Sequence, residues 1–263
     1  MRLGDASVRY EDEGRGDPVL LLHGFPTTRL LWKGVAPILV EAGFRVIVPD
    51  LVGYGESPCP PDAEPDMASQ AGWMLGLLDS LDLARAAVVA HDVGTAAAQL
   101  LVARAPERVR KVVLMDGVHA DAWAMDAVAP IQAWREPSRL HRVLVRQLRM
   151  SGGAARLDEE AVREVLAPYE GDDGGTKLIR AARALRPRQT VEILPALGAR
   201  RVPALVVCGN RDAYLDVEKV GRPLAELLGA RLVVLPGGHF LPMECPREVA
   251  ETVGRFLAMT RPP

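Results

Sequence analysis

Short apolar runs alternate with amphipathic segments along most of the chain, and this pattern predicts its fold. The runs are rich in Val, Leu and Ala and predict strands at residues 19–22, 45–49, 87–90, 111–115, 204–208 and 231–235. Apolar positions at helical spacing predict helices at residues 31–42, 68–81, 94–104, 217–228 and 247–259. Such alternation indicates βαβ units, and therefore an α/β fold with a mostly parallel, doubly wound sheet.

The two ends of this pattern differ from its middle. Residues 6–13 precede a Gly- and Pro-containing turn and predict an antiparallel edge strand. Between residues 118 and 195 the strand pattern stops, and apolar residues recur at helical spacing around glycine-rich breaks at 151–153 and 171–175. We expect a core of residues 1–117 and 196–263. We also expect a helical cap of residues 118–195, inserted after the sixth strand over the carboxyl edge of the sheet.

The most informative short motif is Ala90-His91-Asp92-Val93-Gly94. It joins an apolar strand to an Ala-rich helix through a sharp turn with small residues near its centre. This is the pattern of a nucleophile elbow, which projects one side chain above the carboxyl edge of a sheet. A serine usually occupies the central position, whereas this chain has Asp92.

Further polar motifs follow other predicted strands. Residues 23–26 read His-Gly-Phe-Pro, residues 209–212 read Gly-Asn-Arg-Asp, and residues 237–240 read Gly-Gly-His-Phe. Carboxyl ends of parallel strands meet at one edge, where open α/β sheets bind ligands. The order Asp92, Asp212, His239 is therefore that of nucleophile, acid and base. Asp116, which ends another strand, is the alternative acid.

Composition narrows the class of molecule on which the protein acts. The chain has 263 residues, a formal net charge of −2 and no block of like charges, which argues against nucleic acid and anionic membranes as partners. Its three scattered cysteines indicate neither a disulfide framework nor a metal cluster. We expect a cytoplasmic monomer or homodimer without cofactor or metal, acting on a small apolar molecule.

The motifs together resemble the α/β-hydrolases, in the branch that contains epoxide hydrolases and haloalkane dehalogenases. The resemblance covers nearly the whole chain outside the cap and rests on residues 23–26, 50–57, 91–94, 209–212 and 238–244. It implies that Asp92 attacks an sp3 carbon and forms an alkyl ester. His239, oriented by Asp212, then activates the water that hydrolyses the ester. The backbone N–H groups of Phe25 and Val93 would form the oxyanion hole.

Departures from the family patterns bear on the substrate. Haloalkane dehalogenases that resemble this chain hold the halide with a Trp after the nucleophile and an Asn after His-Gly, where this chain has Val93 and Phe25. Fluoroacetate dehalogenases place an Arg just after the nucleophile, and residues 93–96 contain none. A halide leaving into a pocket without such donors would be poorly stabilised. These absences favour an epoxide as the electrophile.

Epoxide hydrolases use cap tyrosines to bind the epoxide oxygen. Tyr169 is the one tyrosine between residues 118 and 195 and is therefore the first candidate for this role. Trp123, Trp134 and His141 are further candidates for contacting the substrate, and all four residues are equally compatible with packing.

Three classes of function follow from the sequence. The first is an epoxide hydrolase acting on a small or medium apolar epoxide. The second is a dehalogenase with a divergent halide pocket. The third is a non-hydrolytic cyclase, isomerase or binding protein on the same fold.

Overall fold

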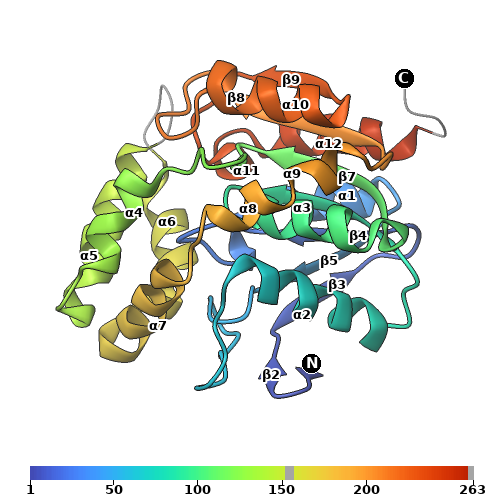
Figure 1. Ribbon diagram of the computed structural model, residues 1–263. Helices are drawn as coiled ribbons and strands as arrows, with labels where there is room; N and C mark the ends of the chain where they lie inside the picture. Colours follow the sequence, from blue (N-terminus) through green and yellow to red (C-terminus); the bar gives the residue numbers. More distant parts are fainter. Residues whose placement is uncertain (152–156, 260–263) are drawn as a thin grey trace.

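A seven-stranded sheet forms the centre of the molecule (Figure 1). The computed structural model describes residues 1–151 and 157–259. The strand order is β3-β5-β4-β6-β7-β8-β9, and every neighbouring pair is parallel except β3 with β5. The bounds are β3 Tyr10–Glu13, β4 Pro18–Leu22, β5 Arg45–Pro49, β6 Ala86–His91, β7 Val109–Met115, β8 Ala204–Gly209 and β9 Arg231–Leu235. The predicted parallel sheet is confirmed.

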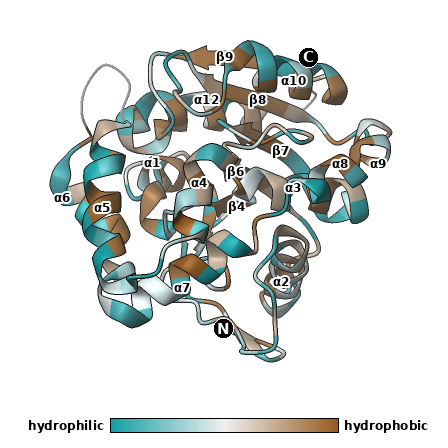
Figure 2. Ribbon diagram, turned by 60° about the vertical axis from the view of Figure 1, so that its left-hand side comes forward, coloured by the Kyte–Doolittle hydropathy of each residue, from teal (hydrophilic) through white to brown (hydrophobic). Residues whose placement is uncertain are grey.

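Helices cover both faces of this sheet. In Figure 2, α1 (Ala36–Glu41) and α12 (Pro246–Ala258) lie on one side, and α2 (Met67–Ser80) and α3 (Gly94–Arg104) lie on the other. Because both faces are covered, β6 is apolar up to His91 at its carboxyl end, and every one of its residues is buried. The predicted helix at 217–228 begins with a π-helical turn, η4 (Val217–Gly221), before α10 (Arg222–Leu228).

The N-terminal edge differs from the prediction. Residues 6–13 do not form one strand. β2 (Ala6–Ser7) pairs with β1 (Arg2–Leu3) in a separate two-stranded sheet, and only β3 joins the main sheet. Between β2 and β3, the Arg9 N–H donates to Ser57 Oγ, and the Arg9 carbonyl accepts the N–H of Asp50, which follows β5.

The chain between β7 and β8 consists, in its described residues, of helices joined by short loops. It contains α4 Met125–Gln132, α5 Pro137–Met150, α6 Glu159–Leu166, η3 Ala167–Tyr169, α7 Gly171–Arg183, α8 Arg188–Glu192 and α9 Leu194–Gly198. Residues 152–156, within the expected cap, lie outside the described residues. The insertion follows the fifth strand of the main sheet, so the expected position after the sixth strand is wrong. Since α8 and α9 contact α3, the helices beside the sheet edge are α4–α7.

Residues 171–175 are not a break in helical structure, contrary to expectation. α7 begins at Gly171, and Asp172 and Asp173 in its first turn favour the helix N-terminus. Gly175 is buried, and a Cβ atom there would lie 2.2 Å from the Pro137 carbonyl oxygen. The glycines therefore allow α7 to pack closely on the start of α5.

Hydrogen bonds fasten the α6–α7 part of the insertion to the core. Lys177 Nζ donates to the Gly55 carbonyl at 2.7 Å, and the Arg180 guanidinium donates to backbone carbonyls of residues 59–63. Thr28 Oγ1 donates to the Val165 carbonyl at 3.2 Å. One side of the insertion is therefore tied to the loops that follow β4 and β5.

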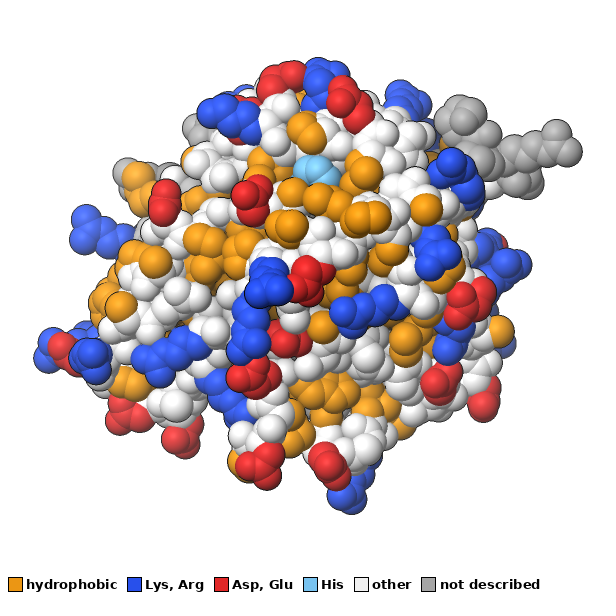
Figure 3. Space-filling model, in the orientation of Figure 1, with side chains coloured by type: hydrophobic (Ala, Val, Ile, Leu, Met, Phe, Trp, Pro, Cys, Tyr) orange, Lys and Arg blue, Asp and Glu red, His pale blue; other side chains and the backbone are white. Residues whose placement is uncertain are grey.

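Charged side chains of both signs are intermixed on the face drawn in Figure 3, without an extended patch of one sign. No helix among the described residues combines the length and hydropathy that crossing a membrane requires.

Candidate active site

Asp92 lies at the predicted turn between β6 and α3. Its φ is +50°, and Thr95 Oγ1 donates to its carbonyl oxygen at 2.6 Å. Neighbouring backbone passes very close: a Cβ atom at Gly94 would lie 2.3 Å from the His23 carbonyl, and one at Gly24 would lie 2.5 Å from Asp92 Cβ. The turn therefore requires glycine at positions 24 and 94, and it directs the Asp92 carboxylate above the sheet edge.

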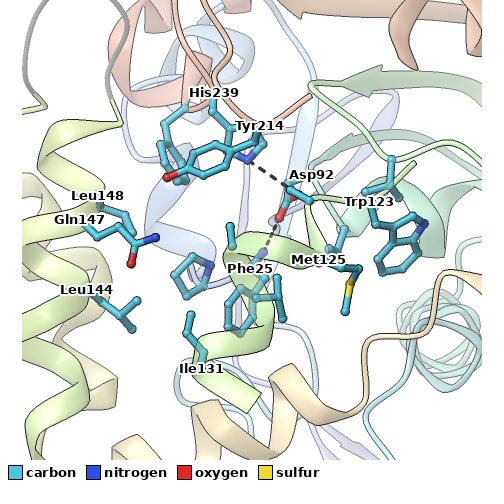
Figure 4. Close-up of a pocket in the computed structure, with 17 residues that line it drawn as sticks. Phe25, Asp92, Trp123, Met125, Ile131, Leu144, Gln147, Leu148, Tyr214 and His239 are labelled. Atoms are coloured by element: carbon cyan, nitrogen blue, oxygen red, sulfur yellow. Dashed lines mark hydrogen bonds and ion pairs between the residues drawn. The ribbon is translucent and has the colours of Figure 1, made fainter. Parts of the chain in front are cut away.

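The two oxygens of the Asp92 carboxylate have different surroundings (Figure 4). Oδ2 accepts the Phe25 N–H at 2.8 Å, and Oδ1 lies 3.7 Å from His239 Nε2. Burial raises the pKa of this carboxyl, whereas the His239 charge and the N–H groups of Val93 and Phe25 oppose that rise. Of the two amides proposed for the oxyanion hole, the Phe25 N–H bonds the carboxylate directly, and the Val93 N–H helps to stabilise its charge.

His239 is held by Asp212. Its Nδ1–H donates to Asp212 Oδ2 at 2.8 Å, and Asp212 Oδ1 accepts the Tyr214 and Leu215 N–H groups at 2.7 and 3.0 Å. Burial opposes the charge on Asp212, but His239 and these N–H groups outweigh it and lower the pKa of the carboxyl. Burial likewise opposes the imidazolium, but Asp212 and then Asp92 raise the pKa of His239 to about 9.

Asp116 is close to this network but does not bond His239. Its Oδ1 accepts the Gly209 N–H at 2.7 Å and so links the end of β7 to β8. Its Oδ2 has no hydrogen-bond partner among the described residues. Burial, followed by the charge of Asp212, raises the pKa of Asp116 well above its usual range. The geometry therefore favours Asp212 over Asp116 as the residue that orients His239.

The backbone around His239 is fixed from two sides. His91 Nε2–H donates to the His239 carbonyl at 2.7 Å, and burial lowers the pKa of His91 to about 3. Glu244, at the end of α11 (Leu241–Glu244), accepts the N–H groups of Gly238 and Phe240 at 2.7 and 3.0 Å. A neutral imidazole and a carboxylate thus position the turn that carries His239.

The loop that supplies the Phe25 N–H is fixed in a similar way. His23 Nδ1–H donates to the Gly24 carbonyl at 2.9 Å, and its Nε2 accepts the Leu51 N–H at 3.0 Å. Asp50 accepts the Arg29 N–H and pairs with the Arg29 guanidinium at 2.8 Å. The loops after β4 and β5 therefore support each other.

A narrow pocket opens above Asp92. Its walls come from α4 (Met125, Val128, Ile131), α5 (Leu144, Leu148) and the core residues Phe25, Val93 and Phe240. Besides Asp92 and His239, the labelled polar residues in Figure 4 are Trp123, Gln147 and Tyr214. A mainly apolar pocket with few polar groups is typical of a small-molecule site.

The structure brings only one of the four expected cap residues to this pocket. Trp123 lines it, but its indole N–H donates to Thr190 Oγ1 at 2.9 Å. Trp134 lies outside the pocket and donates to the Glu136 carbonyl, and His141 lies beside Glu170, with Nε2 3.7 Å from a carboxylate oxygen.

Tyr169 also lies outside the pocket. It is fully buried, its hydroxyl donates to the Thr27 carbonyl at 3.0 Å, and its oxygen accepts the Gly55 N–H at 3.1 Å. The hydroxyl thus joins the cap to two core loops, and the expectation that it faces the substrate is wrong. Sequence composition identified the phenol but not the direction in which η3 points it.

Sequence reasoning missed Tyr214 and Gln147. Tyr214 follows Asp212 by two residues, so its place beside the His239 ring was implicit in that motif. Gln147 lies three residues after Leu144 on α5, and this helical spacing puts it on the face that Leu144 and Leu148 present to the pocket. Among the described residues, no cluster of three His, Cys, Asp or Glu side chains could hold a metal ion.

A family model described as alpha/beta hydrolase fold matches residues 17–148. The chain belongs to this family. It is 28% identical over 266 residues to a haloalkane dehalogenase of Mycobacterium marinum, with 94% of this chain and 87% of the relative covered. It is 36% identical over 107 residues to an epoxide hydrolase of Caballeronia sordidicola, with 40% and 32% covered.

The fold of this α/β-hydrolase is also similar to solved structures. A haloalkane dehalogenase from Bradyrhizobium elkani gives a TM-score of 0.81 at 26% identity, with 98% of this chain and 96% of that chain covered. The resemblance inferred from the motifs is confirmed at the level of family and fold.

The buried position of Tyr169 predicts a structural effect of its removal. Tyr169→Phe should leave the Thr27 carbonyl and the Gly55 N–H without their partner and lower the free energy of unfolding by about 2 kcal/mol. Urea denaturation measures this change, with Tyr10→Phe on the edge strand β3 as the control. A Tyr169→Phe protein as stable as the control would show that these hydrogen bonds contribute little.

Proposed function

We propose that the protein is a hydrolase in which Asp92 attacks an sp3 carbon of an epoxide and forms a covalent ester. The observation that carries this proposal is the unequal setting of the two Asp92 oxygens. Oδ2 is held by the Phe25 N–H, while Oδ1 lies by His239 at the base of an apolar pocket. A carboxylate fixed in this way can present one oxygen to an electrophile.

In the first step, Oδ1 forms a bond to the epoxide carbon as the carbon–oxygen bond of the ring breaks. Asp92 becomes an alkyl ester, and its Oδ2 becomes the ester carbonyl oxygen. That oxygen already accepts the Phe25 N–H at 2.8 Å. The carbonyl is therefore polarised for the second step without any movement of the loop.

In the second step, His239 Nε2 takes a proton from a water that attacks Cγ of Asp92. Negative charge develops on Oδ2, where the N–H groups of Phe25 and Val93 stabilise it. The intermediate expels the alcohol together with Oδ1, and His239 returns the proton to that alcohol. The regenerated Asp92 carboxylate therefore contains one oxygen from water.

The charge on Asp92 gives His239 different protonation states in the two steps. With Asp92 ionised, the pKa of His239 is about 9, so the imidazolium predominates at neutral pH. Ester formation removes the Asp92 charge, which is one of the causes that raise this pKa. The pKa of His239 must then fall, which makes His239 a better base when the ester is ready for hydrolysis.

The polar groups of the pocket favour an epoxide over a haloalkane. A leaving halide needs N–H donors, and besides His239 the Gln147 amide is the one side chain of the described pocket lining left to offer them, since Val93 and Phe25 supply no side-chain donor and the Trp123 indole is bonded to Thr190. A ring-opened epoxide instead needs a proton, and Tyr214 brings a hydroxyl to the pocket. The apolar walls suit a small or medium apolar epoxide.

Haloalkane dehalogenation is the second candidate. The observation that favours it is the similarity to a haloalkane dehalogenase over 94% of this chain. The two candidates share the Asp92 ester but differ in product, since one gives a diol and the other gives an alcohol with free halide. Product analysis on matched epoxides and haloalkanes distinguishes them.

Replacing the proposed base should trap the ester. His239→Gln should consume one equivalent of substrate and then stop, with the mass of the alkyl group retained on the Asp92 peptide, because alkylation needs no base. Intact-mass and peptide mass spectrometry measure the adduct after incubation with panels of epoxides and haloalkanes. His119→Gln, outside the pocket, is the matched control and should turn over normally.

Asp92→Asn should form no adduct. Product formation by His239→Gln at the rate of the His119→Gln control would contradict the proposed role of the base. Loss of the substrate burst in His239→Gln, to the same extent as in Asp92→Asn, would contradict the division into two steps.

The two steps should also differ in pH dependence. Ester hydrolysis should rise with pH through an apparent pKa clearly below about 9, because the esterified enzyme lacks the Asp92 charge that helps hold the pKa of His239 there. Ester formation should fall at acidic pH, where Asp92 becomes protonated. Rapid-quench measurements of both rates between pH 5 and about 10 test this. Hydrolysis that rises only near pH 9 would show that ester formation does not shift His239.

A further inference from the structure

We propose that Tyr214 and Gln147 form an oxygen-binding subsite in the pocket, where Tyr214 protonates the epoxide oxygen and Gln147 donates an N–H to it. This inference rests on the proposed Asp92 chemistry and adds the groups that receive the oxygen of the opened ring. In this proposal Tyr214 has the role that the sequence suggested for Tyr169, which is to bind the epoxide oxygen.

Tyr214 is positioned by the same carboxylate that orients His239. Its N–H donates to Asp212 Oδ1 at 2.7 Å, while Asp212 Oδ2 binds His239 Nδ1. The Tyr214 and His239 rings meet edge to face, with centroids 5.0 Å apart and planes at 68°. The phenol is therefore fixed relative to the proposed base, although it belongs to the core and not to the cap.

The Tyr214 hydroxyl belongs to a short chain of polar groups. The hydroxyl oxygen lies 2.6 Å from Ser151 Oγ, and Ser151 Oγ lies 2.9 Å from the backbone carbonyl oxygen of Gln147. Ser151 has a single hydroxyl proton, which it can donate to either oxygen. When Ser151 donates to Tyr214, the Tyr214 proton becomes available to the substrate, and the Ser151 O–H stabilises the phenolate that results.

Gln147 supplies the second donor. Its side-chain amide lines the pocket between Leu144 and Leu148 and makes no hydrogen bond to any described residue. An amide that faces an apolar cavity loses free energy unless water or a ligand pairs with it. Figure 4 shows this amide and the Tyr214 hydroxyl on the same side of the pocket, with Asp92 across from them. An epoxide oxygen bound by Tyr214 and Gln147 would therefore lie on the opposite side of the ring carbon from the Asp92 oxygen that attacks it.

The Asp92 Oδ1–carbon bond forms, the ring carbon–oxygen bond breaks, and its electron pair stays on oxygen, which takes the Tyr214 proton. The later hydrolysis regenerates Asp92 as a carboxylic acid that ionises. Asp92 thus releases one proton to solvent. The Tyr214 phenolate, which is half-buried, takes one proton from solvent, so the two transfers balance. The sum is epoxide plus water giving diol.

The test compares rates of Asp92 ester formation in a His239→Gln background, which isolates the first step. Styrene oxide is the substrate, and rapid quench with intact-mass detection is the readout. Tyr214→Phe keeps the aromatic ring and removes only the hydroxyl, so relative to the His239→Gln parent it should slow ester formation by about 100-fold. Gln147→Leu should slow it by about 10-fold. Tyr10→Phe, on the edge strand, should have no effect.

The Tyr214 hydroxyl could instead act by holding α5 in place through its hydrogen bond to Ser151. Ser151→Ala tests this alternative, because it removes that hydrogen bond and keeps the Tyr214 phenol. Ser151→Ala should slow ester formation by less than about 10-fold. A loss equal to that of Tyr214→Phe would overturn the donor role. So would ester formation in Tyr214→Phe at the rate of the Tyr10→Phe control. Thermal unfolding of each variant identifies any loss caused by misfolding.

The two proposals fail in different ways. Absence of an ester in the His239→Gln parent, with every epoxide and haloalkane, would overturn the Asp92 mechanism itself. An ester that forms in the parent and equally fast without the Tyr214 hydroxyl would overturn only the subsite.

Discussion

The hydrogen bond from the Phe25 N–H to Asp92 Oδ2 is the interaction on which the site depends. It joins residues 67 positions apart, at the ends of the neighbouring strands β4 and β6. The contact is possible because glycine at positions 24 and 94 lets the two turns approach. By fixing one carboxylate oxygen, it leaves the other beside His239. The sheet order, the two glycines and the elbow turn therefore act together to orient a single carboxylate.

Burial determines how charge is distributed among three neighbouring carboxyl groups. Asp212 remains ionised because it accepts two backbone N–H groups as well as the His239 N–H. Asp116 accepts one N–H at 2.7 Å, and burial raises its pKa well above its usual range. Asp92 lies between these extremes, with its charge supported by His239. His239 therefore pairs most strongly with Asp212, the carboxylate that accepts the most N–H groups. The charge on His239 also supports the ionised form of Asp92.

The sequence predicted the parts of the site that depend on local patterns. The strands and the elbow at Asp92 follow from short-range periodicity and turn chemistry, and the strand-end motifs of Asp212 and His239 meet because parallel strands share an edge. Side-chain directions in the cap could not be predicted in this way. Tyr169 points into the core because η3 packs on the loops after β4 and β5, and Gln147 faces the pocket because of how α5 lies over the sheet. Such contacts join distant segments, so no local pattern reports them.

The central claim is that Asp92 forms a covalent ester, and isotope transfer in a single turnover tests it most directly. Enzyme in excess over an epoxide is allowed one turnover in ¹⁸O-water, and the product and the peptide containing Asp92 are analysed by mass spectrometry. The mechanism predicts a diol without label and one ¹⁸O atom in the Asp92 carboxylate, because the first product leaves with Oδ1. Label in the diol and none in the peptide would mean that water attacks the substrate directly, which would contradict the account.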